Sequence, residues 1–266
     1  MDNRPIGIFD SGIGGLTVFK EVLIELPNES IIYLGDTARV PYGTRSKDII
    51  KKFALELVEF LIKKNVKCLV ASCNTISSTC LEAIQKHSNI PILGVVDPAV
   101  KEAIRTSKNK RIGVIGTNAT IESKIYEKKI KKIDPKSQVF TGSGSLFVPL
   151  IEEGLSNHSS TKKIAEDYLS RFDKTEIDTL ILACTHFPLM TEIIQEIMGK
   201  KVKLVDSAKP TARQLKEILK AKKMVRGESK KPEYEIFVTD APDRVYKVAQ
   251  RFFGNKLPVK PKKVTF

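Results

Sequence analysis

Cysteine is scarce in this chain, with four residues among 266, and the spacing of Cys68, Cys73, Cys80 and Cys184 fits neither a disulfide framework nor a CxxC motif. The chain also lacks an apolar run near the roughly 18 residues of a membrane span, and it begins without the apolar core of a signal peptide. These absences exclude a disulfide-stapled secreted domain and predict a cytoplasmic protein with no membrane partner. A composition of 41% hydrophobic and 29% charged residues is typical of a globular chain with one large domain or two modest ones.

Acidic residues are few at the end of the chain. Residues 200–266 contain 19 Lys and Arg against 7 Asp and Glu, so most of the net charge of +14 lies there. A basic stripe of this kind can bind nucleic acid. However, these lysines are not interleaved with aromatic residues, and no nucleic-acid fold motif accompanies them. We therefore expect solvated surface charge and no nucleic-acid partner.

Apolar runs of strand length alternate with amphipathic helical patterns, which indicates α/β units built on parallel sheets. We expect strands over 5–9, 30–36, 92–96, 111–117, 139–141, 202–206 and 234–239, and two more that lead into Cys73 and Cys184. We expect helices over 16–26, 47–64, 77–87, 99–106, 121–133, 161–172, 208–222 and 243–253. Polar loops are expected over 142–145 and 225–232, the second of them mobile.

The pattern restarts near the middle of the chain. The strand over 111–117 is similar to the opening strand, and Asp10 precedes Cys73 by nearly the same separation as Gly116 precedes Cys184. The chain therefore reads as two copies of one unit. We predict an α/β fold with two similar three-layer α/β/α domains, whose mainly parallel sheets face each other across a central cleft. The first domain comprises 1–98 plus 208–266, and the second comprises 99–207.

Two of the expected strands end in a cysteine that is followed by a threonine within two residues, at Cys73 and Cys184. Open α/β sheets place their ligands at the carboxyl edge of the strands. If the two units pack face to face, the two thiols lie on opposite walls of one cleft. One thiol can then remove a proton from a carbon while the other returns a proton from the far side, which inverts a stereocentre. Asp10 and His186 lie beside the cysteines in this arrangement and can relay those protons.

Several motifs, in chain order, resemble those of the glutamate racemase family. They are Asp10-Ser11-Gly12-Ile13-Gly14-Gly15, Gly35-Asp36-Thr37, Pro41-Tyr42-Gly43, Cys73-Asn74-Thr75, Cys184-Thr185-His186-Phe187-Pro188-Leu189 and Asp206-Ser207-Ala208. The resemblance runs from residue 5 to about residue 215. It implies a racemase without cofactor or metal that interconverts L- and D-glutamate, supplies D-glutamate for peptidoglycan and forms a homodimer.

The resemblance also implies roles for individual residues. Cys73 would act on D-glutamate and Cys184 on L-glutamate, while Asp10, Glu152 and His186 would assist proton transfer. The implied substrate-binding residues are Asp10, Ser11, Pro41, Tyr42, Gly43, Asn74, Thr75, Thr117, Thr120, Thr185 and His186. The chain has Ser143-Gly144-Ser145-Leu146 where the family often has Ala-Cys-Pro, so the resemblance does not indicate how the region around Glu152 packs.

Other functions remain as alternatives. Aspartate racemases share the paired cysteines, but their second motif tends to read Cys-Thr-Glu where this chain has His186. A metal site at Cys73, Cys184 and His186 would have only one local ligand pair, and a pyridoxal-phosphate racemase would need a lysine at a strand end. Four minor expectations complete the set. We expect Cys68 and Cys80 to be apolar fillers, His87 and His158 to be surface residues, Asp36 and Asp97 to be either turn caps or site residues, and Glu153 to face solvent.

Overall fold

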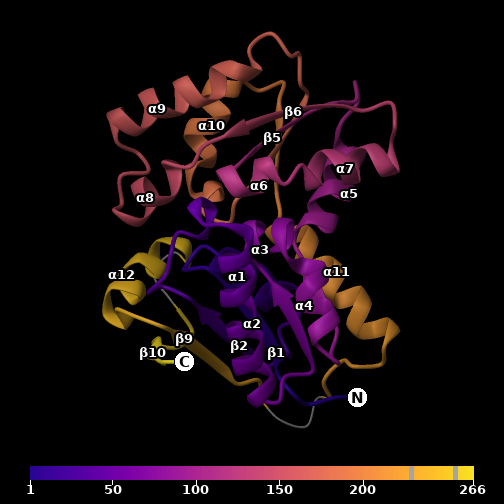
Figure 1. Cartoon of the computed structure of the whole chain (residues 1–266), viewed down its shortest axis with the longest axis vertical. Coiled ribbons are helices and arrows are strands. Elements are labelled where there is room, and N and C mark those ends of the chain that lie inside the picture. Colours follow the sequence, from indigo (N-terminus) through magenta and orange to yellow (C-terminus); the bar gives the residue numbers. More distant parts are fainter. Residues whose placement is uncertain (228–230, 254–256) are drawn as a thin grey trace.

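The structure is a computed structural model that describes residues 1–227, 231–253 and 257–266. The predicted mobile loop over 225–232 lies partly outside these residues, because it includes residues 228–230. The molecule has two lobes stacked along its long axis (Figure 1). The two ends of the chain both belong to the lower lobe, and the middle of the chain forms the upper lobe.

The lower lobe is built on a parallel sheet with the strand order β10-β9-β2-β1-β3-β4. The strands are β1 (Ile6–Asp10), β2 (Ile31–Gly35), β3 (Cys68–Ala71), β4 (Ile92–Gly94), β9 (Tyr234–Val238) and β10 (Lys262–Lys263). One face of the sheet packs against α1 (Leu16–Glu25), α11 (Ala208–Ala221) and α12 (Pro242–Phe253). The other face packs against α2 (Lys47–Lys63), α3 (Asn74–Thr79) and α4 (Leu81–His87). Because both faces are covered, the central strands are apolar at nearly every position.

The upper lobe is built on a second parallel sheet with the order β6-β5-β7-β8. Its strands are β5 (Arg111–Gly116), β6 (Gln138–Ser143), β7 (Thr179–Ala183) and β8 (Lys203–Asp206). Helices α5 (Val96–Thr106) and α7 (Ile125–Ile133) cover one face. Helices α8 (Phe147–Glu152), α9 (Ser159–Leu169) and α10 (Thr191–Met198) cover the other, with the short helices η2 (Ser170–Phe172) and η3 (Phe187–Met190).

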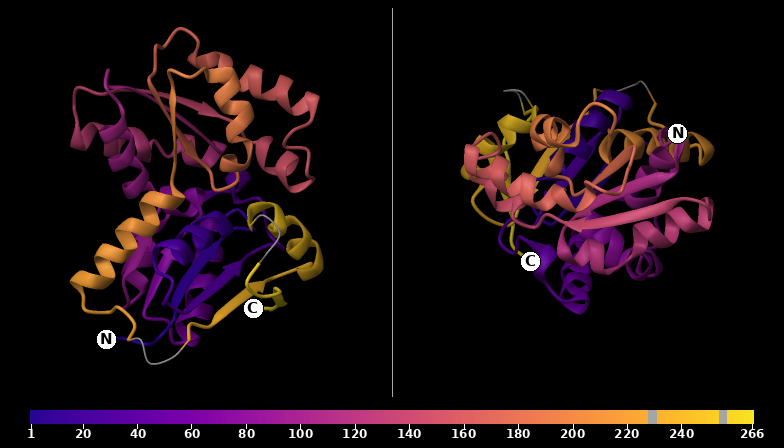
Figure 2. Two further views of the ribbon diagram at one scale, coloured as in Figure 1. Left: turned by 180° about the vertical axis from the view of Figure 1, so that it is seen from behind. Right: turned by 90° about the horizontal axis from the view of Figure 1, so that it is seen from above.

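The order β2-β1-β3-β4 in the lower sheet repeats as β6-β5-β7-β8 in the upper sheet. The predicted α/β fold with two similar units on parallel sheets is therefore confirmed. The carboxyl edges of the two sheets face each other, because Thr75 after β3 contacts Thr117 after β5 and Thr17 contacts Thr185. After β8 the chain returns to the lower lobe as α11, which Figure 2 shows from behind. The division into 1–98 plus 208–266 and 99–207 stays a prediction.

Several element boundaries differ from the expected ones. The helix expected over 77–87 is two helices, because Cys80 leaves the helical region with φ −140°. The helix expected over 121–133 is likewise interrupted, since Lys124 has φ 54°, and α6 (Asn118–Glu122) precedes the break. The strand expected over 92–96 ends at Gly94, and α5 begins at Val96, three residues earlier than expected. The strand expected over 139–141 continues to Ser143, because it pairs with β5 up to Gly116.

Candidate active site

Asp10 ends β1 at the turn into α1, and its side chain is fully buried. Its Oδ2 accepts a hydrogen bond from the backbone N–H of Gly15 at 2.8 Å. Its Oδ1 is also buried and meets no hydrogen-bond partner in the described part of the chain. Burial raises the pKa of Asp10, against the opposing effects of the His186 charge and of backbone N–H groups in the turn. One carboxyl oxygen is thus available to exchange a proton.

Cys73 follows β3 and is the N-cap residue of α3. Its side chain is 4% exposed, and Sγ donates to Ser11 Oγ at 3.4 Å. Burial raises the pKa of Cys73 well above its ordinary value, and the neighbouring Asp10 charge raises it further. Cys73 therefore keeps its proton at neutral pH.

Cys184 follows β7 and is 6% exposed. Its Sγ lies 3.9 Å from His186 Nδ1, and His186 Nε2 lies 3.0 Å from Oε1 of Glu152, the last residue of α8. Burial lowers the pKa of His186, but the hydrogen bonds and charges of Cys184 and Glu152 outweigh it and raise the pKa to about 10. At neutral pH His186 is therefore an imidazolium that lies between Cys184 Sγ and Glu152 Oε1.

The glycine turn between β1 and α1 contacts both Cys73 and the His186 side chain beside Cys184. A Cβ on Gly14 would lie 2.4 Å from both His186 Nδ1 and Thr185 Oγ1, so only glycine fits there. Because Gly14 and Ser11 belong to one turn, a short path of contacts runs from Cys73 through this turn to His186 and Cys184. The structure thus brings together the predicted catalytic residues Asp10, Cys73, Cys184, His186 and Glu152.

Threonine hydroxyls line the contact between the two carboxyl edges. Thr75 Oγ1 lies 3.0 Å from Thr117 Oγ1, which in turn donates to Thr120 Oγ1 at 3.1 Å. All three side chains are buried. Three of the predicted substrate-binding residues therefore form one cluster of hydroxyl groups beside the cysteines.

Tyr42 and Gly43 belong to the short helix η1 (Tyr42–Thr44), which closes the loop after β2. Both are buried, and the Tyr42 hydroxyl donates to the carboxylate of Asp36. A Cβ on Gly43 would lie 2.6 Å from Thr117 Cβ, so η1 packs against the hydroxyl cluster. Pro41, another predicted substrate-binding residue, is exposed at the start of this segment.

The two aspartates left open by the sequence have different surroundings. Asp36 is fully buried and accepts hydrogen bonds from Tyr42, Arg39 and Thr239. Asp97 is 43% exposed and pairs with Lys129 on α7. Asp36 therefore borders the candidate site, whereas Asp97 lies on the surface of the upper lobe.

The minor expectations agree with the described residues. Cys68 and Cys80 are buried in the two cores of the lower lobe, and His87 and His158 are exposed. Glu153 is exposed and pairs with Arg244 of α12. Within residues 1–227, 231–253 and 257–266, no group of three or more His, Cys, Asp or Glu side chains is placed to hold a metal ion. No helix in the same ranges combines the length and the apolar character that a membrane crossing requires.

A family model described as Asp/Glu/hydantoin racemase matches residues 17–215, which is most of the chain. The chain belongs to this family. A curated glutamate racemase from Geobacter metallireducens is 46% identical over 254 residues, which cover 96% of this chain and 94% of that protein.

Solved structures of Asp/Glu/hydantoin racemases are similar over the full length of the chain. The crystal structure of a glutamate racemase isoform from Bacillus anthracis has a TM-score of 0.95 at 36% identity, and covers 100% of this chain and 98% of that one. A glutamate racemase from Francisella tularensis, solved in complex with D-glutamate, has a TM-score of 0.93 at 39% identity with the same coverage. The resemblance to glutamate racemases found in the sequence motifs is therefore confirmed.

Two polar residues beside the candidate site were not predicted to contact it. The Tyr126 hydroxyl on α7 donates to Asn74 Oδ1 at 2.5 Å, and Asn74 Nδ2 donates to Ser207 Oγ at 3.3 Å. Ser207 belongs to one of the sequence motifs, but no role was predicted for it. Tyr126 lies in a helical pattern, and the apolar spacing of that pattern does not indicate that a buried hydroxyl has a polar partner. Together they fix the side-chain amide of Asn74, a predicted substrate-binding residue.

Proposed function

We propose that this racemase interconverts L- and D-glutamate by a two-thiol proton transfer without a cofactor. The observation that supports this best is the pairing of two buried cysteines, each at the carboxyl edge of one repeated sheet and each beside its own ionisable partner. The motifs from Asp10 to Ala208 and the glutamate racemases among the relatives support glutamate as the substrate.

The charges around the two thiols suggest a direction for the first proton transfer. The His186 imidazolium places a positive charge 3.9 Å from Cys184 Sγ, whereas burial and the Asp10 charge raise the pKa of Cys73. In our proposal the Cys184 thiolate removes the α-proton of L-glutamate, and the Cys73 thiol donates a proton to the opposite face to give D-glutamate. The reverse reaction needs the Cys73 thiolate, and the free Oδ1 of Asp10 is placed to take that proton.

The α-hydrogen of an amino acid is a weak acid, so the carbanion-like transition state needs preorganised donors. The proposed donors are the hydroxyls of Ser11, Thr75, Thr117 and Thr185, together with the Asn74 amide that Tyr126 and Ser207 hold in place. Buried hydroxyl and amide dipoles of this kind stabilise developing charge more strongly than water does.

The decisive measurement is racemisation in deuterated water, followed by chiral chromatography and mass spectrometry. Wild-type protein is expected to turn over glutamate faster than aspartate and to load solvent deuterium onto the α-carbon. Cys73→Ala and Cys184→Ala are each expected to lose roughly 10²–10⁴-fold in turnover, the range of a general acid or base. Cys68→Ala is the matched control, since that cysteine is also buried but lies at the first residue of β3, the end of the strand opposite to Cys73.

Three outcomes would contradict the proposal. Faster turnover of aspartate would point to an aspartate racemase. Full activity of either cysteine variant would remove the two-thiol mechanism. Inactivation by borohydride with a trapped lysine adduct would replace it by pyridoxal-phosphate chemistry.

We also propose a cytoplasmic homodimer that supplies D-glutamate for peptidoglycan, as the family resemblance implies. The nucleic-acid alternative has less support, because basic side chains of the last quarter pair with acidic ones, as in Lys216–Glu25, Lys262–Glu235 and Lys263–Asp240. Light scattering of the purified chain tests the dimer, and a salt titration of DNA binding tests the alternative.

A further inference from the structure

The side chain of Asn74 lies where three segments of the chain meet between the lobes. Asn74 begins α3 in the lower lobe, directly after Cys73. Its Oδ1 accepts a hydrogen bond at 2.5 Å from the hydroxyl of Tyr126, which belongs to α7 of the upper lobe. Its Nδ2 donates to Oγ of Ser207 at 3.3 Å, where the chain passes from β8 into α11. The Asn74 amide therefore joins the two lobes.

The Tyr126 side chain is anchored in the upper lobe. Its ring is 2% exposed and belongs to the apolar cluster that α5 and α7 form with β5 and β7. Burial raises the pKa of Tyr126 above its ordinary value, and the charges of Cys184 and Asp97 raise it further. The hydroxyl therefore keeps its proton and can donate to Asn74. Without this hydroxyl the buried amide oxygen would lose its partner, which costs more than the loss of an exposed hydrogen bond.

The residue after Asn74 also has its partner in the upper lobe. Thr75 Oγ1 lies 3.0 Å from Oγ1 of Thr117, which follows β5, and both Asn74 and Thr75 are buried. The two site cysteines are almost fully buried as well, so a substrate reaches them only when the lobes separate. Separation breaks the contacts of Asn74 with Tyr126 and of Thr75 with Thr117, and closure restores them.

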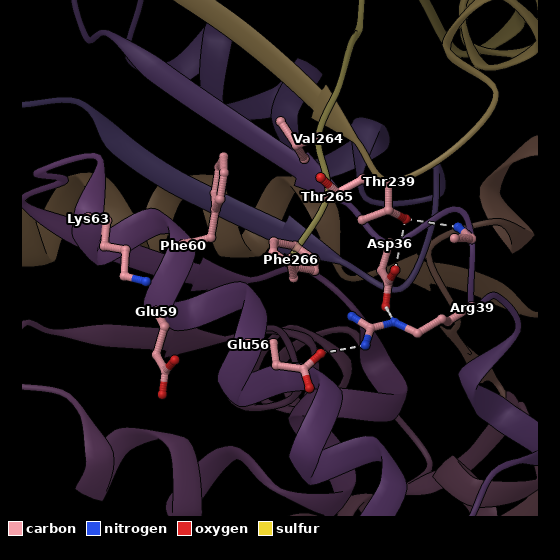
Figure 3. A pocket seen from close by; sticks show the side chains of 11 residues that line it. Asp36, Arg39, Glu56, Glu59, Phe60, Lys63, Thr239, Val264, Thr265 and Phe266 are labelled. Carbon is pink, nitrogen blue, oxygen red and sulfur yellow. Dashed lines mark hydrogen bonds and ion pairs between the residues drawn. The ribbon is translucent and has the colours of Figure 1, made fainter.

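The other tyrosine hydroxyl beside the hydroxyl cluster is held within one lobe. Tyr42 donates to the carboxylate of Asp36, and both residues belong to the lower lobe. Figure 3 shows Asp36 joined to Arg39 and Thr239 as well, in the wall of a cavity of the same lobe. These bonds do not depend on the upper lobe. The bond of Tyr126, in contrast, exists only when the lobes are closed.

We propose that Tyr126 is a positioning residue, whose hydroxyl fixes the Asn74 amide to donate to the substrate carboxylate when the lobes close. The inference rests on the proposed racemase function, because it concerns a donor to glutamate. An amide nitrogen carries two hydrogens, and the bond to Ser207 uses one of those on Nδ2. The other remains for a carboxylate oxygen of glutamate. In an open molecule the amide lacks the contact that Tyr126 supplies, so the donor is fixed only after closure.

The kinetic test uses Tyr126→Phe, which keeps the ring in the upper-lobe cluster and removes only the hydroxyl. The carboxylate of glutamate gains negative charge in the carbanion-like transition state, so a misplaced donor should lower kcat/KM. We expect a loss of about tenfold, which corresponds to about 1.4 kcal/mol. Tyr234→Phe is the matched control and should keep kcat/KM unchanged. Tyr234 begins β9 at the sheet edge opposite to the site, and its hydroxyl donates to the carbonyl of Pro27 at 3.4 Å.

A double-mutant cycle separates positioning from general packing. Asn74→Ala alone should lower kcat/KM at least as much as Tyr126→Phe does. If Tyr126 acts through Asn74, then Tyr126→Phe should cost less than about twofold in the Asn74→Ala background, because the group that it positions is already gone. A further tenfold loss in that background would assign Tyr126 to packing and overturn the proposal, and so would an unchanged kcat/KM in Tyr126→Phe.

Alkylation tests the link to lobe closure without turnover. Tyr126→Phe removes a buried bond between the lobes, so iodoacetamide should label Cys73 and Cys184 up to about tenfold faster than in the wild type. Labelling of the core residue Cys68 should not change, and Tyr234→Phe should label like the wild type. Unchanged labelling of both site cysteines in Tyr126→Phe would overturn the inference even if the wild type racemises glutamate normally. A wild-type chain that racemises no amino acid would instead contradict the proposed function.

Discussion

At the scale of single residues, His186 is the positively charged side chain of the candidate site. Its ring is buried between Cys184 and Glu152, and these neighbours raise its pKa to about 10. The unfolded chain has a histidine pKa near 6.5, so the folded state binds this proton more tightly. The resulting stability is complete below about pH 6.5 and is lost as the pH rises through about 10.

We therefore expect the free energy of unfolding to fall more steeply between pH 6.5 and pH 10 in the wild type than in His186→Asn. The difference in that fall should exceed about 1 kcal/mol, the value of somewhat less than one pKa unit. Urea unfolding at the two pH values measures it, and subtracting the variant removes the titration of lysines and cysteines common to both proteins. Equal falls would mean that His186 is neutral in the folded state.

The positions of some of these residues could be predicted from the sequence, and those of others could not. The positions of Cys73, Cys184, Asp10 and His186 were predictable because each lies at or just after the end of a strand, and parallel strands bring their carboxyl ends to one edge. Asp36 also follows a strand, but its surroundings could not be predicted, because it accepts a hydrogen bond from Thr239, which is 203 positions away in the sequence. Tyr126 was missed because a helical pattern shows which face is buried and not which polar atom that face meets.

At the scale of elements, the turn between β1 and α1 fits under the upper lobe only because Gly14 has no side chain. A methyl group there would lie 2.4 Å from His186 Nδ1 and Thr185 Oγ1. We expect Gly14→Ala to displace His186 and to lower kcat/KM about 10²-fold, since a shift of about 1 Å in a catalytic group costs roughly that factor.

The control for this prediction is Gly7→Ala in β1, the strand that precedes the turn. A Cβ at Gly7 would lie 2.8 Å from Leu69 Cδ2, in the core and away from the site. Thermal unfolding should show both variants to be less stable, whereas steady-state kinetics on the folded protein should show a loss for Gly14→Ala alone. Similar losses of kcat/KM in the two variants would assign the effect of Gly14 to general packing.

Element boundaries were less predictable than element types, for a local reason. The breaks at Cys80 and Lys124 depend on backbone angles of φ −140° and 54°, which neighbouring packing imposes and the apolar spacing does not reveal. The apolar spacing over 77–87 and 121–133 indicates only that one face is buried on both sides of each break. The repetition of one unit was more accessible, because the restart at 111–117 marks a second copy of the first unit, and the two sheets share one strand order.

At the scale of the whole molecule, the two lobes meet edge to edge and leave the cysteines almost inaccessible. Cys73 is 4% exposed and Cys184 is 6% exposed, close to the 2% and 4% of the core cysteines Cys68 and Cys80. A substrate that reaches Cys73 and Cys184 therefore requires the lobes to separate, as in other enzymes whose sites open and close. The contacts between the edges include polar bonds such as Thr75–Thr117 and Thr17–Thr185. Leu189 of the upper lobe packs against an apolar cluster of each lobe, but most residues of each cluster belong to one lobe, so we expect separation to leave most of both cores in place.

This arrangement predicts different alkylation kinetics for cysteines of equal burial. We expect lobe separation to expose Cys73 and Cys184, which follow β3 and β7 at the facing carboxyl edges, whereas Cys68 and Cys80 lie within the lower lobe and become accessible only when that lobe itself unfolds. Iodoacetamide labelling, read peptide by peptide by mass spectrometry, should modify Cys184 before Cys68 and Cys80. Cys73 should react more slowly than Cys184, because the neighbouring Asp10 charge still raises its pKa when the lobes separate and the thiolate is the reactive form. Glutamate should slow labelling at Cys73 and Cys184 and leave the core pair unchanged. Labelling of all four cysteines at one common rate would show instead that they react only through global unfolding, and that the lobes do not separate on their own.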